Sequence, residues 1–194
     1  MSVFLTLDLK TWRPGEVEHW YTSRDMREKL PELSKDEDFL KALMIDNLGC
    51  GLAIDGKVVS RCTFMYNGES SGDMLQMYEQ HVVDLFEGKP VTIHFYEEMT
   101  SWRLTPDGDE EMIWEVMDDS RGISNTKVEQ EGRTLRLPFI KAAISWLTEA
   151  INVLKRYEEV VKRAGGQDFE DQIDMAQRLL DFSRQTLIDK GWKP

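Results

Sequence analysis

Apolar residues at every second position predict a strand over residues 2–9, one face of which is formed by Val3, Leu5, Leu7 and Leu9. Three later runs, 91–96, 101–105 and 111–117, are rich in β-branched and aromatic residues and are typical of strands. Residues 127–137 predict either a last hairpin that turns near Gly132 or a single edge strand. The first part of the chain is therefore expected to be rich in sheet.

The dipeptide Asp55-Gly56 separates two strand-like runs and suits the positive φ angles of a two-residue hairpin turn. A regular hairpin around it places Leu52 opposite Val59. In that register Cys50 and Cys62 lie on opposite faces of the ribbon, and a disulfide between them would require a bulge. We therefore expect both cysteines to remain thiols.

A second hairpin is predicted at Thr105-Pro106-Asp107-Gly108, where proline suits a type I turn and glycine suits the left-handed position after it. The resulting register sets Arg103 opposite Glu111.

Helical periodicity is clearest in the second half of the chain. A helix over 71–87 has Ser71 as a possible N-cap and Gly88 as its stop. Pro138 is expected at the first position of a long amphipathic helix that ends near residue 163, before Gly165-Gly166. A further helix covers 168–189 and completes an antiparallel pair. Two short, weakly patterned helices are expected over 16–30 and 35–45.

These elements predict an α+β fold: a mostly antiparallel sheet of about six strands, with a central helix and a C-terminal helical hairpin packed on one face. The 194 residues are expected to form a single domain, with a sheet-rich core over 1–137 and the helical hairpin over 138–190. No apolar run approaches the length of a membrane helix. With two cysteines and no secretory signal pattern, the chain is expected to be cytoplasmic.

Negative charge is concentrated in the middle of the chain. Residues 67–132 hold 16 acidic and four basic residues, whereas the segments on either side have net charges of −2 and +2. The total of −12 excludes non-specific binding to nucleic acid, which requires a basic surface. The acidic segment is interpreted either as a solvated surface or as a binding face for a basic partner.

The binding interpretation gives a set of candidate contact residues, in which carboxylates supply charge and two aromatic residues serve as possible anchors. They are Tyr96, Glu97, Glu98, Trp102, Asp107, Asp109, Glu110, Glu111, Glu115, Asp118 and Asp119.

The motifs of known catalytic and cofactor sites are absent from the sequence. It contains no glycine-rich nucleotide loop, nucleophile elbow, zinc-binding HExxH or CxxC, and the acidic run lacks the spacing of a calcium loop. No catalytic residue, cofactor or metal site is therefore predicted. His94 shares a strand face with Thr92 and Tyr96, a face that is either the wet side of the sheet or a recognition surface.

The acidic hairpin over 97–119 and the segment RTLRLPFIKAAISWLTEAINVL at 133–154 resemble, in the order of their elements, bacterial immunity proteins. These are small antitoxins that protect a cell against polymorphic or contact-dependent toxins. The resemblance implies a non-catalytic protein that occludes a toxin domain, often a basic nuclease. From charge, motifs and hydropathy, we expect no cofactor, no direct binding to nucleic acid and no contact with a membrane.

Three alternatives stay open. The chain could be a DNA mimic whose carboxylates replace phosphates. It could be a small enzyme or ligand-binding protein with a pocket between sheet and helices, lined by His94, Tyr96, Arg103 and Glu115. The exposed part of helix 138–163 or the edge strand 127–137 could also form a homodimer interface.

Overall fold

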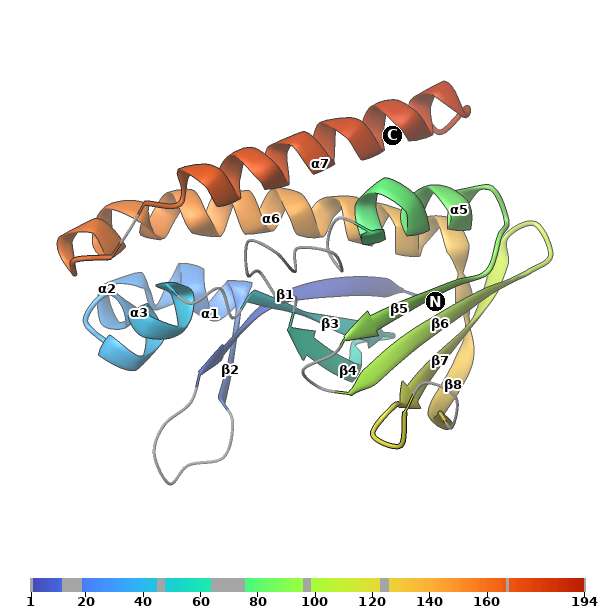
Figure 1. Ribbon diagram of the computed structural model, residues 1–194, viewed down its shortest axis with the longest axis horizontal. Helices are drawn as coiled ribbons and strands as arrows, with labels where there is room; N and C mark the ends of the chain where they lie inside the picture. Colours follow the sequence, from blue (N-terminus) through green and yellow to red (C-terminus); the bar gives the residue numbers. More distant parts are fainter. Residues whose placement is uncertain are drawn as a thin grey trace.

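The computed structural model describes residues 2–11, 19–44, 48–63, 76–95, 99–122, 126–166 and 168–193. Within these ranges the chain is α+β, with eight strands in two antiparallel four-stranded sheets and a layer of helices that lies along both (Figure 1). The expected α+β class and antiparallel pairing are confirmed, whereas the expected sheet of about six strands is only roughly right. The first four strands in the chain pair only with one another, and so do the last four, so the strands form two sheets.

The first sheet has the strand order β2-β1-β3-β4. Its members are β1 (Val3–Thr11), β2 (His19–Thr22), β3 (Leu48–Ile54) and β4 (Lys57–Thr63). β1 has the alternating apolar residues that predict it, and two of them, Leu7 and Leu9, are buried against the helical layer. Their side chains are 1% and 0% exposed. β1 is a central strand, since β2 and β3 pair with it on either side.

The β3–β4 hairpin has the predicted turn, with φ angles of 48° at Asp55 and 78° at Gly56. Its register departs from the prediction, because a bulge at Val59 shifts the pairing so that Leu52 lies opposite Ser60. Cys50 is then directly opposite Cys62. The expectation that the two cysteines occupy opposite faces was wrong, since one extra residue reverses the face of every residue beyond it.

The second sheet follows chain order, β5-β6-β7-β8. It consists of β5 (Val91–Phe95), β6 (Thr100–Asp107), β7 (Glu111–Asp118) and β8 (Lys127–Leu135). The β6–β7 ladder extends through Pro106 to Asp107, which pairs with Glu111, and Gly108 takes a φ of 77° in the loop beyond. The predicted register was therefore wrong by four positions, but an even shift keeps each side chain on its predicted face.

Residues 127–135 form an edge strand rather than a hairpin, and Gly132 lies within it. Gly132 faces Trp114, and a Cβ added at Gly132 would lie 2.7 Å from the indole ring. Real Cβ atoms essentially never come that close to a neighbour, so glycine is required here to admit the tryptophan.

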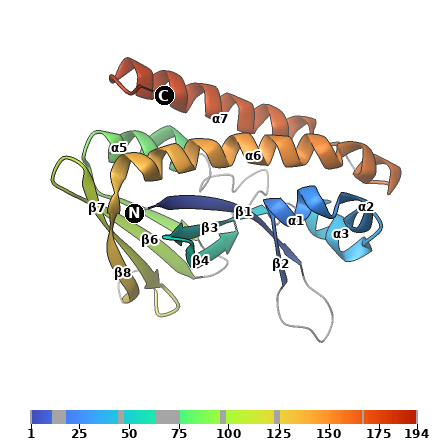
Figure 2. The ribbon, with the colours of Figure 1, turned by 180° about the vertical axis from the view of Figure 1, so that it is seen from behind.

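The helical layer lies on one side of both sheets in both views (Figures 1 and 2). It contains α6 (Arg136–Arg163), α7 (Glu170–Asp189), the short π-helix η1 (Met77–His81) and α5 (Val82–Phe86). The predicted antiparallel pair of C-terminal helices is confirmed, although α6 begins two residues before Pro138. Gly88 and Gly165 have φ angles of 80° and 83° beyond the ends of α5 and α6, as predicted. Ser71, the expected N-cap of the central helix, lies outside the described residues.

By length and composition alone, α6 is the one helix within the described ranges that could cross a membrane. Twelve of its side chains are buried, however, and they pack on β1, α5 and α7. Trp146 also donates its indole N–H to the carbonyl of Gly49 at 3.3 Å. The apolar side chains of α6 therefore form part of the protein core.

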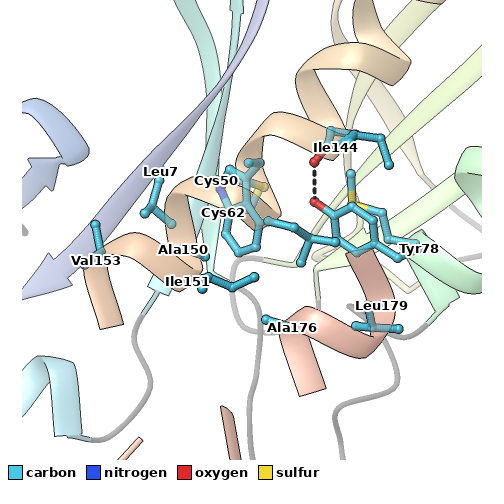
Figure 3. Close-up of a cluster of buried hydrophobic side chains, with 14 of the residues drawn as sticks. Leu7, Cys50, Cys62, Tyr78, Ile144, Ala150, Ile151, Val153, Ala176 and Leu179 are labelled. Atoms are coloured by element: carbon cyan, nitrogen blue, oxygen red, sulfur yellow. Dashed lines mark hydrogen bonds between the residues drawn. The ribbon is translucent and has the colours of Figure 1, made fainter. Parts of the chain in front are cut away.

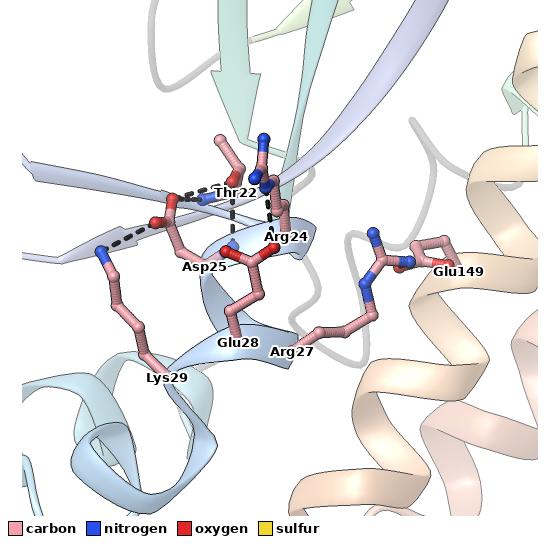
Figure 4. A network of polar contacts seen from close by, with 7 residues as sticks. All are labelled: Thr22, Arg24, Asp25, Arg27, Glu28, Lys29 and Glu149. Atoms are coloured by element: carbon pink, nitrogen blue, oxygen red, sulfur yellow. Dashed lines mark hydrogen bonds and ion pairs between the residues drawn. The ribbon is translucent and has the colours of Figure 1, made fainter.

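The weakly patterned segment after β1 holds three short helices, α1 (Ser23–Glu28), α2 (Leu30–Leu33) and α3 (Glu37–Met44). A reciprocal cap between Thr22 and Asp25 starts α1, and Arg27 reaches Glu149 of α6 at 3.0 Å (Figure 4). The expected helix over 16–30 is therefore shorter, because His19–Thr22 pairs with β1 as an edge strand.

Candidate functional site

Six of the predicted acidic residues lie along the β6–β7 hairpin, where basic side chains lie among them. Asp107 forms an ion pair with Arg133 of β8, and Glu111 lies 3.6 Å from the same guanidinium. Glu115 receives two 2.5 Å hydrogen bonds from Arg103 of the neighbouring strand. These three carboxylates are therefore engaged within the protein.

Asp118 is the last residue of β7 and Asp119 follows it, and both are also held by local contacts. The backbone N–H of Ser120 donates to Asp118 at 2.8 Å, and the contacts of Ser120 lower the pKa of Asp118 below its usual range. Asp119 accepts a hydrogen bond from the hydroxyl of Ser101. Its side chain is only 9% exposed, which leaves it little access to a partner.

His94, Ser101 and Asp119 form a cluster that combines the residue types of a hydrolase triad. Nδ1 of His94 lies 2.7 Å from Ser101 Oγ and 3.5 Å from Asp119. In a triad, the histidine uses two different ring nitrogens to link serine and carboxylate. Here both contacts involve Nδ1, and Ser101 is fully buried and donates its proton to Asp119. These contacts join the ends of β5, β6 and β7, and their geometry differs from that of a hydrolase triad.

Among the predicted residues that the structure describes, two carboxylates remain, those of Asp109 and Glu110, and they lie at the tip of the hairpin. Both residues are exposed, and neither carboxylate forms an ion pair or hydrogen bond with any part of the chain that the structure describes. Their backbone carbonyls accept hydrogen bonds from Arg136, at 2.5 Å from the guanidinium to Asp109 and 2.8 Å from the backbone N–H to Glu110. Arg136 thus fixes the loop and leaves both carboxylates available.

Asp109 and Glu110 border a hollow of about 440 Å³ between the hairpin tip, the end of α5 and the start of α6. Its remaining lining is mostly apolar: Phe86, Leu135, Arg136, Leu137, Pro138 and Ile140. Leu137 is 42% exposed, a high value for a leucine. We refer to these eight residues as the tip pocket. The tip pocket combines an apolar floor with two exposed carboxylates at its edge.

The sequence elements that carry the resemblance meet at the tip pocket. The acidic hairpin supplies the carboxylates, and the Leu-Pro segment 135–138 supplies much of the floor. Sequence reasoning missed Phe86, the last residue of α5, and Arg136, whose contacts depend on the true hairpin register. Extending the β6–β7 ladder through Pro106 would have placed Asp109 and Glu110 at the turn, beside the strand that leads into α6.

Of the two predicted aromatic anchors, only Trp102 lies in the described part of the chain, and it does not join this site. Trp102 is fully buried in the core and its proposed role as an exposed anchor was wrong, because β6 is a central strand and Trp102 points towards the first sheet. Trp114 is only 7% exposed. Tyr96, Glu97 and Glu98 lie outside the described residues.

In the ranges that the structure describes, no three His, Cys, Asp or Glu side chains lie together as a metal site would require. Comparisons of the chain with protein-family models, with curated proteins and with solved structures gave no match.

Proposed function

We propose that this chain is a non-catalytic binding protein whose tip pocket receives a basic side chain of a partner protein. Lys and Arg carry long aliphatic stems that pack on apolar surface while the charged group stays at the edge. The floor formed by Leu137 and Pro138 suits such a stem, and Asp109 and Glu110 suit its cationic end.

The observation that carries this proposal is the difference between these two carboxylates and their neighbours. Asp107, Glu111 and Glu115 each have a carboxylate close to an arginine side chain of this chain. The carboxylates of Asp109 and Glu110 form no ion pair among the described residues, because Arg136 donates to the backbone carbonyls of these two residues instead. Charged groups that stay unpaired beside exposed apolar surface are suited to a partner that supplies the opposite charge.

We further propose that the partner is a basic toxin domain, as the resemblance to immunity proteins implies. A net charge of −12 would speed encounter with such a domain through long-range attraction. A desolvated contact in the tip pocket would then supply the anchor that keeps the complex together. Binding of this kind blocks the toxin by occlusion and requires no chemistry from this chain.

A DNA mimic is less well supported. Such a protein needs carboxylates spaced along a continuous face, in the manner of phosphates. Arg103 of β6 and Arg133 of β8 lie among the acidic residues of the hairpin and neutralise three of them. The acidic segment is therefore not a continuous anionic strip.

The proposal is tested with two double variants of equal charge. Asp109→Asn/Glu110→Gln removes both carboxylates of the tip pocket, and Glu129→Gln/Glu131→Gln removes two exposed carboxylates of β8. The wild type is used at low salt to capture a partner from lysate of the native cells. The captured protein is then purified, and its affinity for all three forms is measured by calorimetry at two salt concentrations.

We expect the tip-pocket variant to lose at least about tenfold in affinity and the β8 variant to lose less than about threefold. Equal losses would mean that only total charge matters, and the tip pocket would not be the binding site. Release of the partner by duplex DNA at micromolar concentration would favour the DNA mimic instead.

A further inference from the structure

The bulge at Val59 places two buried cysteines opposite each other. Cys50 of β3 and Cys62 of β4 form a directly facing pair, and both are completely shielded from solvent. Figure 3 shows them together beneath α6, in the same cluster as Ala150 and Ile151. Without the extra residue in β4 they would lie on opposite faces of the ribbon.

This placement satisfies the distance requirement of a disulfide. Facing residues of an antiparallel pair have Cα atoms about 4.5 or 5.5 Å apart, depending on the position in the ladder. Disulfides join residues whose Cα atoms are about 4.4–6.8 Å apart and whose Cβ atoms point to the same side. Either kind of facing pair meets both conditions, so β3 and β4 need not separate for the bond to form.

The position of β4 gives a route for reagents to reach the pair. β4 is an edge strand of its sheet, so its release uncovers Cys62 together with the side of Cys50 that faces β4. Side-chain contacts outside the β3–β4 ladder also hold β4 in place. Trp102 donates to Ser60 at 2.9 Å, Gln130 donates to the carbonyl of Val59 at 3.1 Å, and Arg61 forms a 3.1 Å ion pair with Asp8 of β1. Local opening of this hairpin, rather than static exposure, is the step that admits an oxidant.

We propose that Cys50 and Cys62 form a redox couple that closes to a cross-strand disulfide when the protein meets an oxidised low-molecular-weight disulfide such as glutathione disulfide. This inference is independent of partner binding. The bond would link β3 and β4 across the core and stabilise the hairpin against opening.

The reaction proceeds by two exchanges. One cysteine loses its proton, and its sulfur attacks glutathione disulfide, breaking the S–S bond and releasing one glutathione thiolate. The second cysteine then loses its proton and attacks the mixed disulfide, so that the Cys50–Cys62 bond forms and a second glutathione leaves. Two protein thiols are oxidised, one glutathione disulfide is reduced, and the two released protons are taken up by the two glutathione thiolates.

The experiment equilibrates the full-length protein in buffers of varied reduced and oxidised glutathione, with and without urea. Equilibrium is approached both from the reduced protein and from protein oxidised in urea and then refolded, so that slow opening does not distort the result. Samples are quenched in acid, denatured, treated with N-ethylmaleimide and weighed by intact-mass spectrometry. The expected product is lighter than the reduced chain by two hydrogen atoms and takes up no maleimide.

We expect the disulfide of the folded chain to persist in buffers at least about tenfold more reducing than those tolerated in urea, because native pairing holds the sulfurs together. The same or lower persistence in the folded state would overturn the proposal. So would folded protein that gains glutathione adducts without the internal bond. Cys50→Ser and Cys62→Ser are the controls, and each is expected to give a mixed disulfide only.

Discussion

The indole N–H of Trp102 donates a 2.9 Å hydrogen bond to the hydroxyl of Ser60, and this bond joins the two sheets through their strands β6 and β4. The ring of Trp102 also packs against Phe95, with 4.6 Å between ring centroids. A fully buried residue in this position stabilises the fold and is not accessible to a partner.

Breaking this bond from either side is expected to destabilise the protein. Ser60→Ala leaves a buried indole N–H without its acceptor and is expected to cost about 1–2 kcal/mol. Trp102→Phe removes the donor together with part of a buried ring and is expected to cost about 2–3 kcal/mol. Urea unfolding of both single variants and the double variant measures the coupling. Costs that simply add would show that the bond contributes nothing.

Gly132→Ala is expected to destabilise the second sheet by about 1–3 kcal/mol, since the new Cβ would meet the indole of Trp114 at 2.7 Å. Trp114→Leu in the same chain removes the obstructing ring. The measurement is thermal unfolding of the two single variants and the double variant. A double variant less stable than Trp114→Leu by the full cost of Gly132→Ala would contradict the steric explanation.

The cap of α1 is expected to give the protein an acid-sensitive component of stability. The hydrogen bond from Lys29, together with those from Thr22, lowers the pKa of Asp25 to about 2. Because the folded-state pKa lies below the ordinary value of 3.8, this stabilisation is present above about pH 4 and is lost as the pH falls through about 2.

Asp25→Ala is therefore expected to lower the free energy of unfolding by about 1 kcal/mol at neutral pH, with a smaller effect near pH 2. Urea unfolding over this pH range measures the difference. The exposed pair Arg24–Glu28 provides the control, and Glu28→Ala is expected to change stability by less than about 0.5 kcal/mol. A difference between wild type and Asp25→Ala that stays constant down to pH 2 would contradict the assigned role.

Local signals predicted local structure well in this chain. Asp55-Gly56, Gly88 and Gly165 each take the positive φ that their positions suggested, because the left-handed region is favoured by glycine and tolerated by aspartate. Long periodic patterns predicted α6 and α7, because the hydrogen bonds of a helix also form within one continuous segment.

The register of the hairpins and the assignment of strands to two sheets could not be predicted from the sequence. The bulge at Val59 is associated with non-local contacts, including the bond from Gln130 to its carbonyl, which no local pattern reveals. The β6–β7 ladder runs through Pro106 although proline usually marks a turn. The division into two sheets depends on which distant strands pair, and hydrophobic alternation is the same in either arrangement.

The charge distribution gave a misleading picture of the surface. Arg133 and Arg136 belong to the C-terminal segment of net charge +2, yet they lie against the hairpin of the acidic middle segment. Folding therefore brings basic residues of the C-terminal segment next to acidic residues of the middle segment. Only the structure separates the engaged carboxylates from Asp109 and Glu110.

Site-specific photocrosslinking tests the central claim most directly. A photoreactive phenylalanine analogue replaces Leu137 in the tip pocket or, as a control of similar exposure, Val128 on β8. With the purified partner, we predict a crosslink from position 137 that disappears in the Asp109→Asn/Glu110→Gln background and persists in the Glu129→Gln/Glu131→Gln background. Equal crosslinking from positions 137 and 128, or a crosslink at 137 that survives loss of both tip-pocket carboxylates, would contradict the account.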